Sequence, residues 1–152
     1  MSGSPGVPAG AAPHPDHDGW FYWPEIPTDS FAGQTGLMLF RAEGAGARVR
    51  WFPTDTHVNM GGSIFGGAVL SFIDMALFAG GRCAGMDEGH YVTLDCSVQF
   101  IGRGRIGVPL DAEVRLVKQT AGGHVFFIGT CDQDGEPTHS FSGTLKRVKP
   151  RG

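Results

Sequence analysis

The sequence is poor in the residues that stabilise small secreted domains and in those that bind polyanions. Its 152 residues include only three cysteines, which are far apart and form no CxxC pair, so neither a disulfide framework nor a zinc site is expected. Charged residues make up 18% of the chain and the net charge is -3, which gives no general attraction to nucleic acid or anionic membrane. We therefore predict core thiols, no metal, and neither nucleic acid nor a membrane as a partner.

The first residues have neither a basic segment nor an apolar run, so they do not resemble a secretory signal. Residues 63–81 are nearly long enough to span a bilayer, but Asp74 lies near their middle and glycine pairs lie at both ends. We interpret this segment as a buried core helix and expect a cytoplasmic protein.

The composition indicates one domain with an N-terminal arm. Hydrophobic residues make up 41% of the chain and include 11 phenylalanines, enough for one core but too few for two. Residues 1–33 are taken as a Pro/Gly-rich arm that is partly mobile, and residues 34–149 as the folded domain. Four aromatics in residues 20–23 expose too much apolar area for water, so we expect them to dock on the domain or on a partner subunit.

The hydrophobic pattern predicts an α+β fold in which an antiparallel sheet is covered by one long helix. Period-two alternation marks a strand over residues 91–101, with Val92 and Leu94 on the same inward face as Cys96 and a polar face that includes Thr93. The nearly continuous apolar run at 124–131 predicts a strand covered on both faces, which suggests subunit packing. The remaining expected strands are residues 37–40, 47–52, 110–116 and a last strand that ends at Val148.

Asp74 is the first candidate for chemistry because it is the one ionisable group between residues 63 and 81. A carboxylate within an apolar helix is costly unless it is paired or used. The alternative is a structural acid that is hydrogen-bonded to the backbone or lies at a wet edge. The residues upstream of Asp74 favour the functional interpretation.

These residues form the pattern Asn59-x(5)-Phe65-Gly66-Gly67-x(6)-Asp74. The pattern resembles Asn-x(5)-His-Gly-Gly-x(6)-Asp of the hotdog-fold acyl-CoA thioesterases, in the PaaI-like and 4-hydroxybenzoyl-CoA thioesterase superfamily. The resemblance covers about residues 36–148. It implies a hotdog fold, in which an antiparallel sheet wraps one central helix, and an acyl-CoA thioesterase activity without a cofactor, coenzyme A being part of the substrate.

The resemblance also implies residue roles. The Gly66 backbone N–H, at the positive end of the helix, would polarise the thioester carbonyl, as expected for a developing oxyanion. Asp74 would be the nucleophile or the general base on water, and Asn59 would position the thioester or water. Thr93 falls where some relatives place a hydroxyl that orients the attacking water. Gly67 would lie beside the substrate.

Phe65 stands where the family commonly has histidine, and it removes one polar contact to the thioester. This departure supports an alternative, a non-catalytic acyl-CoA binding or sensing module. A third reading, an acyl-thioester dehydratase, is weak because such relatives use a histidine. His57 is near in sequence, but we interpret this loop histidine as structural.

Gly66 and Asp74 lie about 12 Å apart along a helix, too far for both to contact one carbonyl. Two antiparallel helices across a two-fold axis would bring Gly66 of one subunit near Asp74 of the other, so a homodimer is expected, or a tetramer. Arg103 and Arg105 are the nearest clustered cations for the phosphates of coenzyme A, with solvated loop charges as the alternative. The aromatic and methionine side chains that could line an acyl pocket, or simply the core, are Phe65, Phe72, Met75 and Phe78.

Overall fold

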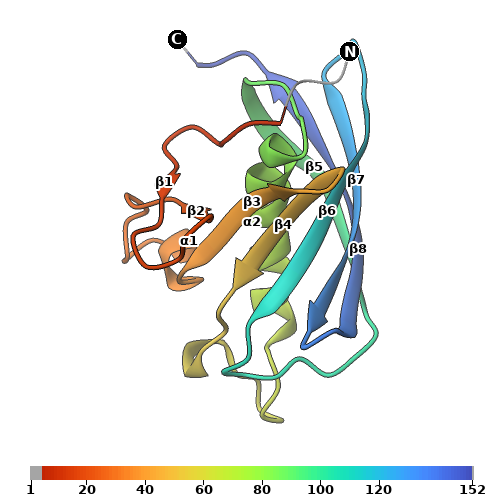
Figure 1. Cartoon of the computed structure of the whole chain (residues 1–152). Helices are drawn as coiled ribbons and strands as arrows, with labels where there is room; N and C mark the ends of the chain where they lie inside the picture. The colour runs from red at the N-terminus through yellow and green to blue at the C-terminus, as the bar shows by residue number, and fades with distance from the viewer. Residues whose placement is uncertain (1–4, 152) are drawn as a thin grey trace.

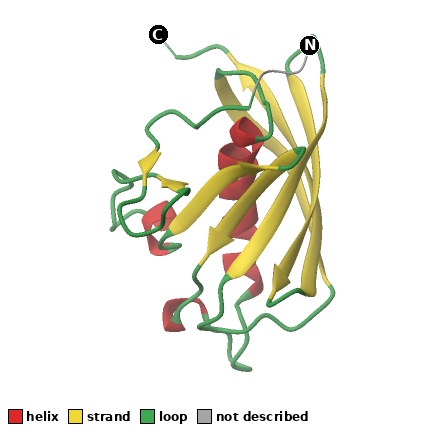
Figure 2. Cartoon of the chain, in the orientation of Figure 1, coloured by secondary structure: helices red, strands yellow, loops and turns green. Residues whose placement is uncertain are grey.

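The computed structural model describes residues 5–151, and these form one curved antiparallel sheet around a long helix (Figure 1). The helix α2 lies on the concave face of the sheet (Figure 2). The order of the strands in the sheet is β1-β2-β3-β4-β6-β7-β8-β5, so β5 is at one edge. The elements are β1 (Ala12–Pro13), β2 (Phe21–Tyr22), α1 (Phe31–Gln34), β3 (Met38–Glu43), β4 (Gly46–Trp51), the 3-10 turn η1 (Asp55–His57), α2 (Gly66–Cys83), β5 (His90–Phe100), β6 (Leu110–Gln119), β7 (His124–Gln133) and β8 (Glu136–Val148).

The predicted α+β arrangement is therefore confirmed. One face of α2 is buried against the sheet, and its glycines allow a close approach: a Cβ atom on Gly80 would lie 2.8 Å from Val114 Cγ2. Trp51 of β4 stacks on Phe72 of α2 with ring centroids 5.2 Å apart. Aromatic burial of this kind contributes much of a small core. Among the described residues, no helix combines the length and apolar character that a membrane span requires.

The expected facing of β5 is wrong in its first half. The ladder between β5 and β8 shifts register between Thr93 and Asp95. Thr93 pairs with the buried Leu145, so it faces the core side with Cys96, whereas Leu94 lies at the bulge with 53% of its surface exposed. A bulge adds one residue to the strand and reverses the facing of every side chain on one side of it. A simple alternation pattern does not contain this information.

The N-terminal arm is joined to the sheet through β1 and β2, where Phe21 pairs with Phe40 of β3. Trp20 is buried between the guanidinium groups of Arg41 and Arg50, which lie 4.1 and 4.9 Å from its ring. The expected docking of the aromatic segment on the domain is thus confirmed. The hydrophobic pattern predicts neither a strand before residue 34 nor a second helix, so the sequence interpretation misses β1, β2 and α1.

The outer face of the sheet carries two kinds of surface. Arg48 and Arg50 form ion pairs with Asp111, at 3.0 and 2.8 Å, beside the arm. Farther along the sheet, Phe126 and Ile128 of β7 are more than 40% exposed. The described residues of this chain thus leave one face of β7 exposed. That another subunit covers this face stays a prediction.

Candidate active site

The candidate site is built along the exposed side of α2, beginning at its first residue. Phe65 is the N-cap and provides no side-chain cap, while its carbonyl accepts hydrogen bonds from the N–H groups of Ala68 and Val69. Within residues 5–151 the N–H groups of Gly66 and Gly67 have no recorded acceptor. Free N–H groups at a positive helix end stabilise an oxyanion. The structure therefore offers donors where the sequence predicted them.

Phe100, at the end of β5, lies over Gly66 and was missed by the sequence interpretation as a site residue. A Cβ atom on Gly66 would be 3.4 Å from Phe100 Cζ, and 54% of Phe100 remains exposed. Its other neighbour is the buried His139, in an edge-to-face contact with centroids 5.2 Å apart. Burial lowers the pKa of His139 and favours its neutral form. The alternation of β5 indicated the facing of Phe100, but not its position over α2.

Asn59 holds the loop that leads into α2. Its side-chain oxygen accepts hydrogen bonds from the N–H groups of Gly61 and Ser63, both at 2.9 Å. These two donors fix the orientation of the amide, so the NH₂ group of Asn59 is the free end. Within the described residues that NH₂ group has no recorded acceptor. It is therefore available to donate to a bound carbonyl or water.

His57 has a structural place beneath this loop. It is buried, its Nδ1 accepts a hydrogen bond from Thr54 N–H at 2.9 Å, and its Nε2 lies 2.8 Å from the Gln34 carbonyl. An Nδ1 that accepts and an Nε2 that donates define a neutral imidazole. This arrangement supports the structural interpretation of His57.

The two candidate cations differ in their surroundings. Arg103 donates to Ser63 Oγ at 2.7 Å and to the Gly61 carbonyl at 3.1 Å, so it braces the loop before α2. Arg105 lies 3.3 Å from the Asp134 carboxylate. Both arginines line one depression of about 470 Å³, together with Glu136. The fold thus brings the two arginines together, but acidic side chains lie in the same depression.

Asp74 is half-buried on the exposed side of α2, and Thr93 Oγ1 donates to its Oδ1 at 2.7 Å. Asp74 is therefore paired by a hydroxyl of the chain itself and is partly open to solvent, and its role in the reaction stays a prediction. The cause of this pairing is the bulge of β5, which turns Thr93 toward α2.

The thiol of Cys96 lies on the same side of β5. Burial, followed by the negative charges of Asp74 and Asp95, raises the pKa of Cys96. The thiol is protonated at neutral pH, so Cys96 is no thiolate nucleophile. Within residues 5–151 no group of three or more His, Cys, Asp or Glu side chains is arranged to hold a metal ion.

Phe65 is 56% exposed and folds back on Gly67, whose Cβ position would be 2.6 Å from its ring. Together with Phe31, Val58 and Ser71 it lines a pocket of about 370 Å³ beside the start of α2. The departure from histidine thus makes the rim of the helix N-terminus apolar.

The candidate residues of one chain fall into two separate groups. Gly66, with Phe100 and the Asn59 loop, is at the start of α2, whereas Asp74 and Thr93 lie two turns farther on. Eight residues of helix correspond to about 12 Å of rise. The chain alone therefore does not bring the N–H donor and the carboxylate to one carbonyl group.

Residues 61–138 match the Thioesterase superfamily. The chain belongs to this family. The matched residues contain Gly66, Asp74 and Thr93, whereas Asn59 lies just before them. The comparison with curated proteins gives no match.

Solved structures share the fold of this thioesterase superfamily member at low sequence identity, which confirms the hotdog fold. The PaaI protein of the E. coli phenylacetic acid degradation operon is 19% identical, with a TM-score of 0.66 over 77% of this chain and 83% of its own. A putative thioesterase from Ralstonia eutropha is 22% identical, with a TM-score of 0.65 over 81% of this chain and 93% of its own. A Streptococcus mutans protein bound to acetyl CoA is 17% identical, with a TM-score of 0.64 over 84% of this chain and 97% of its own.

Proposed function

We propose that this protein is an acyl-CoA thioesterase that hydrolyses its substrate to the free acid and coenzyme A. The observation that carries the proposal is the arrangement along α2, where Thr93 holds the Asp74 carboxylate and the Gly66 N–H is free. Family membership supports the reaction class, and the acetyl CoA bound to the S. mutans protein supports the substrate class.

The reaction needs a polarised carbonyl and an attacking oxygen. The Gly66 N–H donates to the thioester oxygen and stabilises the oxyanion, while the Asn59 amide positions the thioester or water. Asp74 attacks the carbonyl carbon, or takes a proton from the water that does so. The C–S bond then breaks and the CoA thiolate leaves, taking up a proton. If Asp74 is the nucleophile, water then hydrolyses the acyl–Asp74 anhydride, which releases the free acid and restores the carboxylate. Since Thr93 occupies Oδ1, the second carboxylate oxygen of Asp74 is the reacting one.

The complete site requires a homodimer. Strand β5 is at the end of the sheet, so its outer edge has no partner strand within the described residues. Val92 and Leu94 on this strand are 43% and 53% exposed. Pairing of two β5 edges about a two-fold axis gives each exposed edge a partner strand. It also places the two α2 helices antiparallel on one face of the joined sheet. Gly66 of one protomer then approaches Asp74 of its partner.

The other substrate contacts follow from this placement. Phe65 and Gly67 flank the thioester at the start of α2, and Arg103 and Arg105 bind phosphates of coenzyme A from their shared depression. Exposed β7 side chains allow a tetramer built from two such dimers. A binding module without catalysis is the second candidate, because the exposed Phe65 replaces a polar histidine.

The deciding experiment measures free-thiol release from a panel of short, medium, long and aryl acyl-CoA esters, for wild type and Asp74→Asn at matched dimer content. We expect turnover by wild type and its collapse in the variant. Binding of an ester without thiol release by wild type refutes hydrolysis and supports the binding module.

The shared site is tested by mixing two inactive variants, Asp74→Asn and Gly66→Val. A mixed dimer contains one site with a native Gly66 from the first variant and a native Asp74 from the second. Activity should return toward half of the wild-type value per mixed dimer. If both groups act within one chain, every site in the mixture is defective and no activity returns.

A further inference from the structure

The N-terminal arm and α2 form the two walls of an open apolar pocket. It has a volume of about 480 Å³ and is lined by Trp23 and Ile26 of the arm and by Met75 and Phe78 of α2. Gly10 and Glu25 complete the lining. The volume is within the range of about 300–1,000 Å³ that is typical of small-molecule sites.

The arm wall of this pocket is fixed by contacts with the rest of the chain. Trp23 Nε1 donates to the Ala9 carbonyl at 3.2 Å, and the Trp23 ring packs on Phe40 of β3 with centroids 4.8 Å apart. The pairing of β1 with β2 holds the two passes of the arm together. The pocket is therefore preformed, which reduces the cost of ordering on binding.

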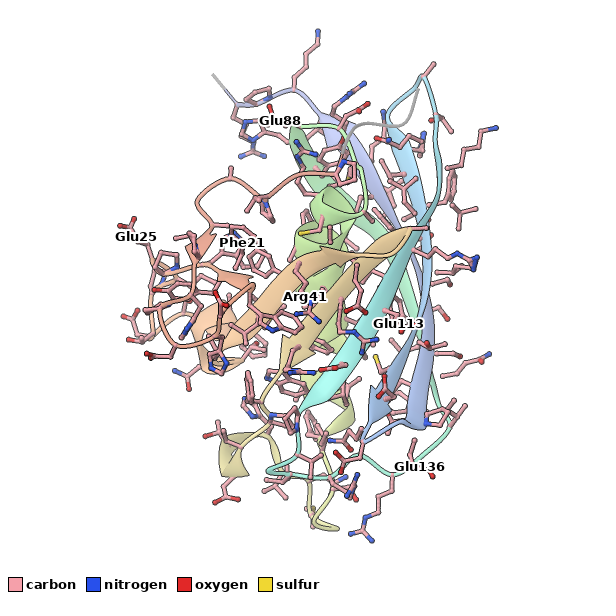
Figure 3. The ribbon with its side chains drawn as sticks, viewed as in Figure 1. Phe21, Glu25, Arg41, Glu88, Glu113 and Glu136 are labelled. Atoms are coloured by element: carbon pink, nitrogen blue, oxygen red, sulfur yellow. The ribbon has the colours of Figure 1, made fainter. Side chains whose placement is uncertain are left out.

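The pocket lies along the helix that carries the candidate carboxylate. Met75 follows Asp74 directly on α2, and Phe78, four residues after Asp74, lies one turn farther on the same face of the helix as Asp74. Glu25, the one charged residue in the lining, is exposed and lies on the outer side of the arm (Figure 3). The interior therefore has no charge to pair with a polar or carboxylated ligand, and burial of such a group would be costly.

A second cavity of about 270 Å³ continues behind Met75. It shares Trp23, Ile26 and Met75 with the first pocket and extends to Leu37 and Met38. Methionine is unbranched and adapts its shape readily. Met75 thus lines both cavities, and its flexible side chain allows their shape to adapt.

We propose that the arm pocket binds the acyl group of the thioester, and that this group is an uncharged hydrocarbon chain or ring. The proposal rests on the proposed function and specifies its substrate class. Trp23 and Ile26 precede residues 61–138, so this wall lies outside the matched region of the family. Trp23 and Met75 are then specificity-determining residues.

The test compares kcat/KM for acetyl-, hexanoyl-, octanoyl- and adipoyl-CoA. For wild type we expect an increase of up to about fourfold for each buried methylene, and a lower value for adipoyl-CoA than for hexanoyl-CoA. Trp23→Leu should lower kcat/KM at least tenfold more for octanoyl- than for acetyl-CoA. Met75→Ala should shift the highest kcat/KM toward esters with longer acyl chains.

Trp20→Leu is the matched control, because Trp20 belongs to the same arm but lies between Arg41 and Arg50, away from the pocket. It should keep the wild-type dependence on chain length. Ile26→Ala replaces Trp23→Leu if thermal unfolding shows that the tryptophan variant does not fold. The proposal is overturned if the pocket variants lose kcat/KM equally with acetyl- and octanoyl-CoA. It is also overturned if the kcat/KM of wild type does not depend on chain length.

Binding measurements test the acyl pocket independently of the thioesterase proposal. Calorimetric titration of Asp74→Asn, which should not consume the ester, should show tighter binding of octanoyl-CoA than of coenzyme A, and adding the pocket substitutions to Asp74→Asn should reduce this difference. If no ester is hydrolysed but this pattern is found, the acyl pocket stands and the thioesterase proposal fails. If esters are hydrolysed but the pattern is absent, the acyl pocket fails and the thioesterase proposal stands.

Discussion

Thr93 Oγ1 of β5 donates a hydrogen bond to Asp74 Oδ1 of α2 across 2.7 Å. This contact joins the exposed edge strand to the central helix at the carboxylate proposed for the reaction. It depends on the bulge after Thr93, without which the hydroxyl would face the other side of the sheet.

Thr93→Ala should lower kcat about 10- to 100-fold, because one hydrogen bond to a charged group contributes about 1.5–3 kcal/mol and orients the carboxylate. Thr93→Ser keeps the hydroxyl and should retain most of the activity. Steady-state kinetics of both variants check the prediction. Equal activity of the alanine and serine variants would show that the hydroxyl has no role in turnover.

Gly66→Ala should separate activity from stability. Its Cβ atom would meet Phe100 at an ordinary contact distance of 3.4 Å, so the free energy of unfolding should change by less than about 0.5 kcal/mol. The methyl group nevertheless stands where a substrate must approach the N–H, so kcat/KM should fall at least tenfold. Denaturant unfolding and kinetics on one preparation test this. Full activity would remove Gly66 from the proposed mechanism.

Gly80→Ala should show the opposite behaviour on the same helix. Its Cβ atom would be 2.8 Å from Val114 Cγ2 and 3.1 Å from Val49 Cγ2, so the core must shift. Overpacking costs about 1–3 kcal/mol, against which alanine gains about 1 kcal/mol of helix propensity. We expect a net loss of up to about 2 kcal/mol in urea unfolding, with Gly66→Ala as the control. A higher stability contradicts the close packing of α2.

Acid should weaken the fold through Asp111. Burial alone would raise the pKa of Asp111, but hydrogen bonds and charges from Arg50 and Arg48 outweigh it, and the pKa lies below its usual value. A lowered pKa gives stability that is present above about pH 4 and lost as the pH falls toward the folded-state pKa. Asp111→Asn should lose about 2 kcal/mol at pH 7.

The check is the free energy of unfolding from pH 7 to pH 3. The difference between wild type and Asp111→Asn should shrink as the pH falls below about 4. Glu136→Gln, an exposed acid for which the structure records no ion pair within residues 5–151, serves as control and should follow wild type. A difference that is independent of pH argues against the ion pairs as its source.

Charges on the β5 edge should dissociate the proposed dimer. In the double variant Val92→Glu and Leu94→Glu, each new carboxylate approaches the edge of an identical strand, where like charges repel. Light scattering should report a monomer, and thiol release should be lost although far-UV circular dichroism is retained. Phe126→Glu on β7 is the control and should leave the proposed dimer intact. A fully active monomer contradicts the shared site.

The sequence predicted those features that depend on local periodicity. The apolar run of residues 63–81 predicted the helix that carries Gly66 and Asp74, and helical geometry then fixes the distance between positions eight residues apart. The alternation of β6 and the apolar run of β7 likewise indicated strands. The resemblance in this segment corresponds to the family match over residues 61–138.

Only the tertiary structure decided which side chains meet across distant segments. The bulge brings Thr93 to Asp74, the end of β5 brings Phe100 to Gly66, and the arm brings Trp23 to Met75. A one-residue shift of register reverses the facing of a strand without a clear local signal. The sequence by itself thus determined the helix and its candidate groups, whereas the position of their partners follows from packing over the whole chain.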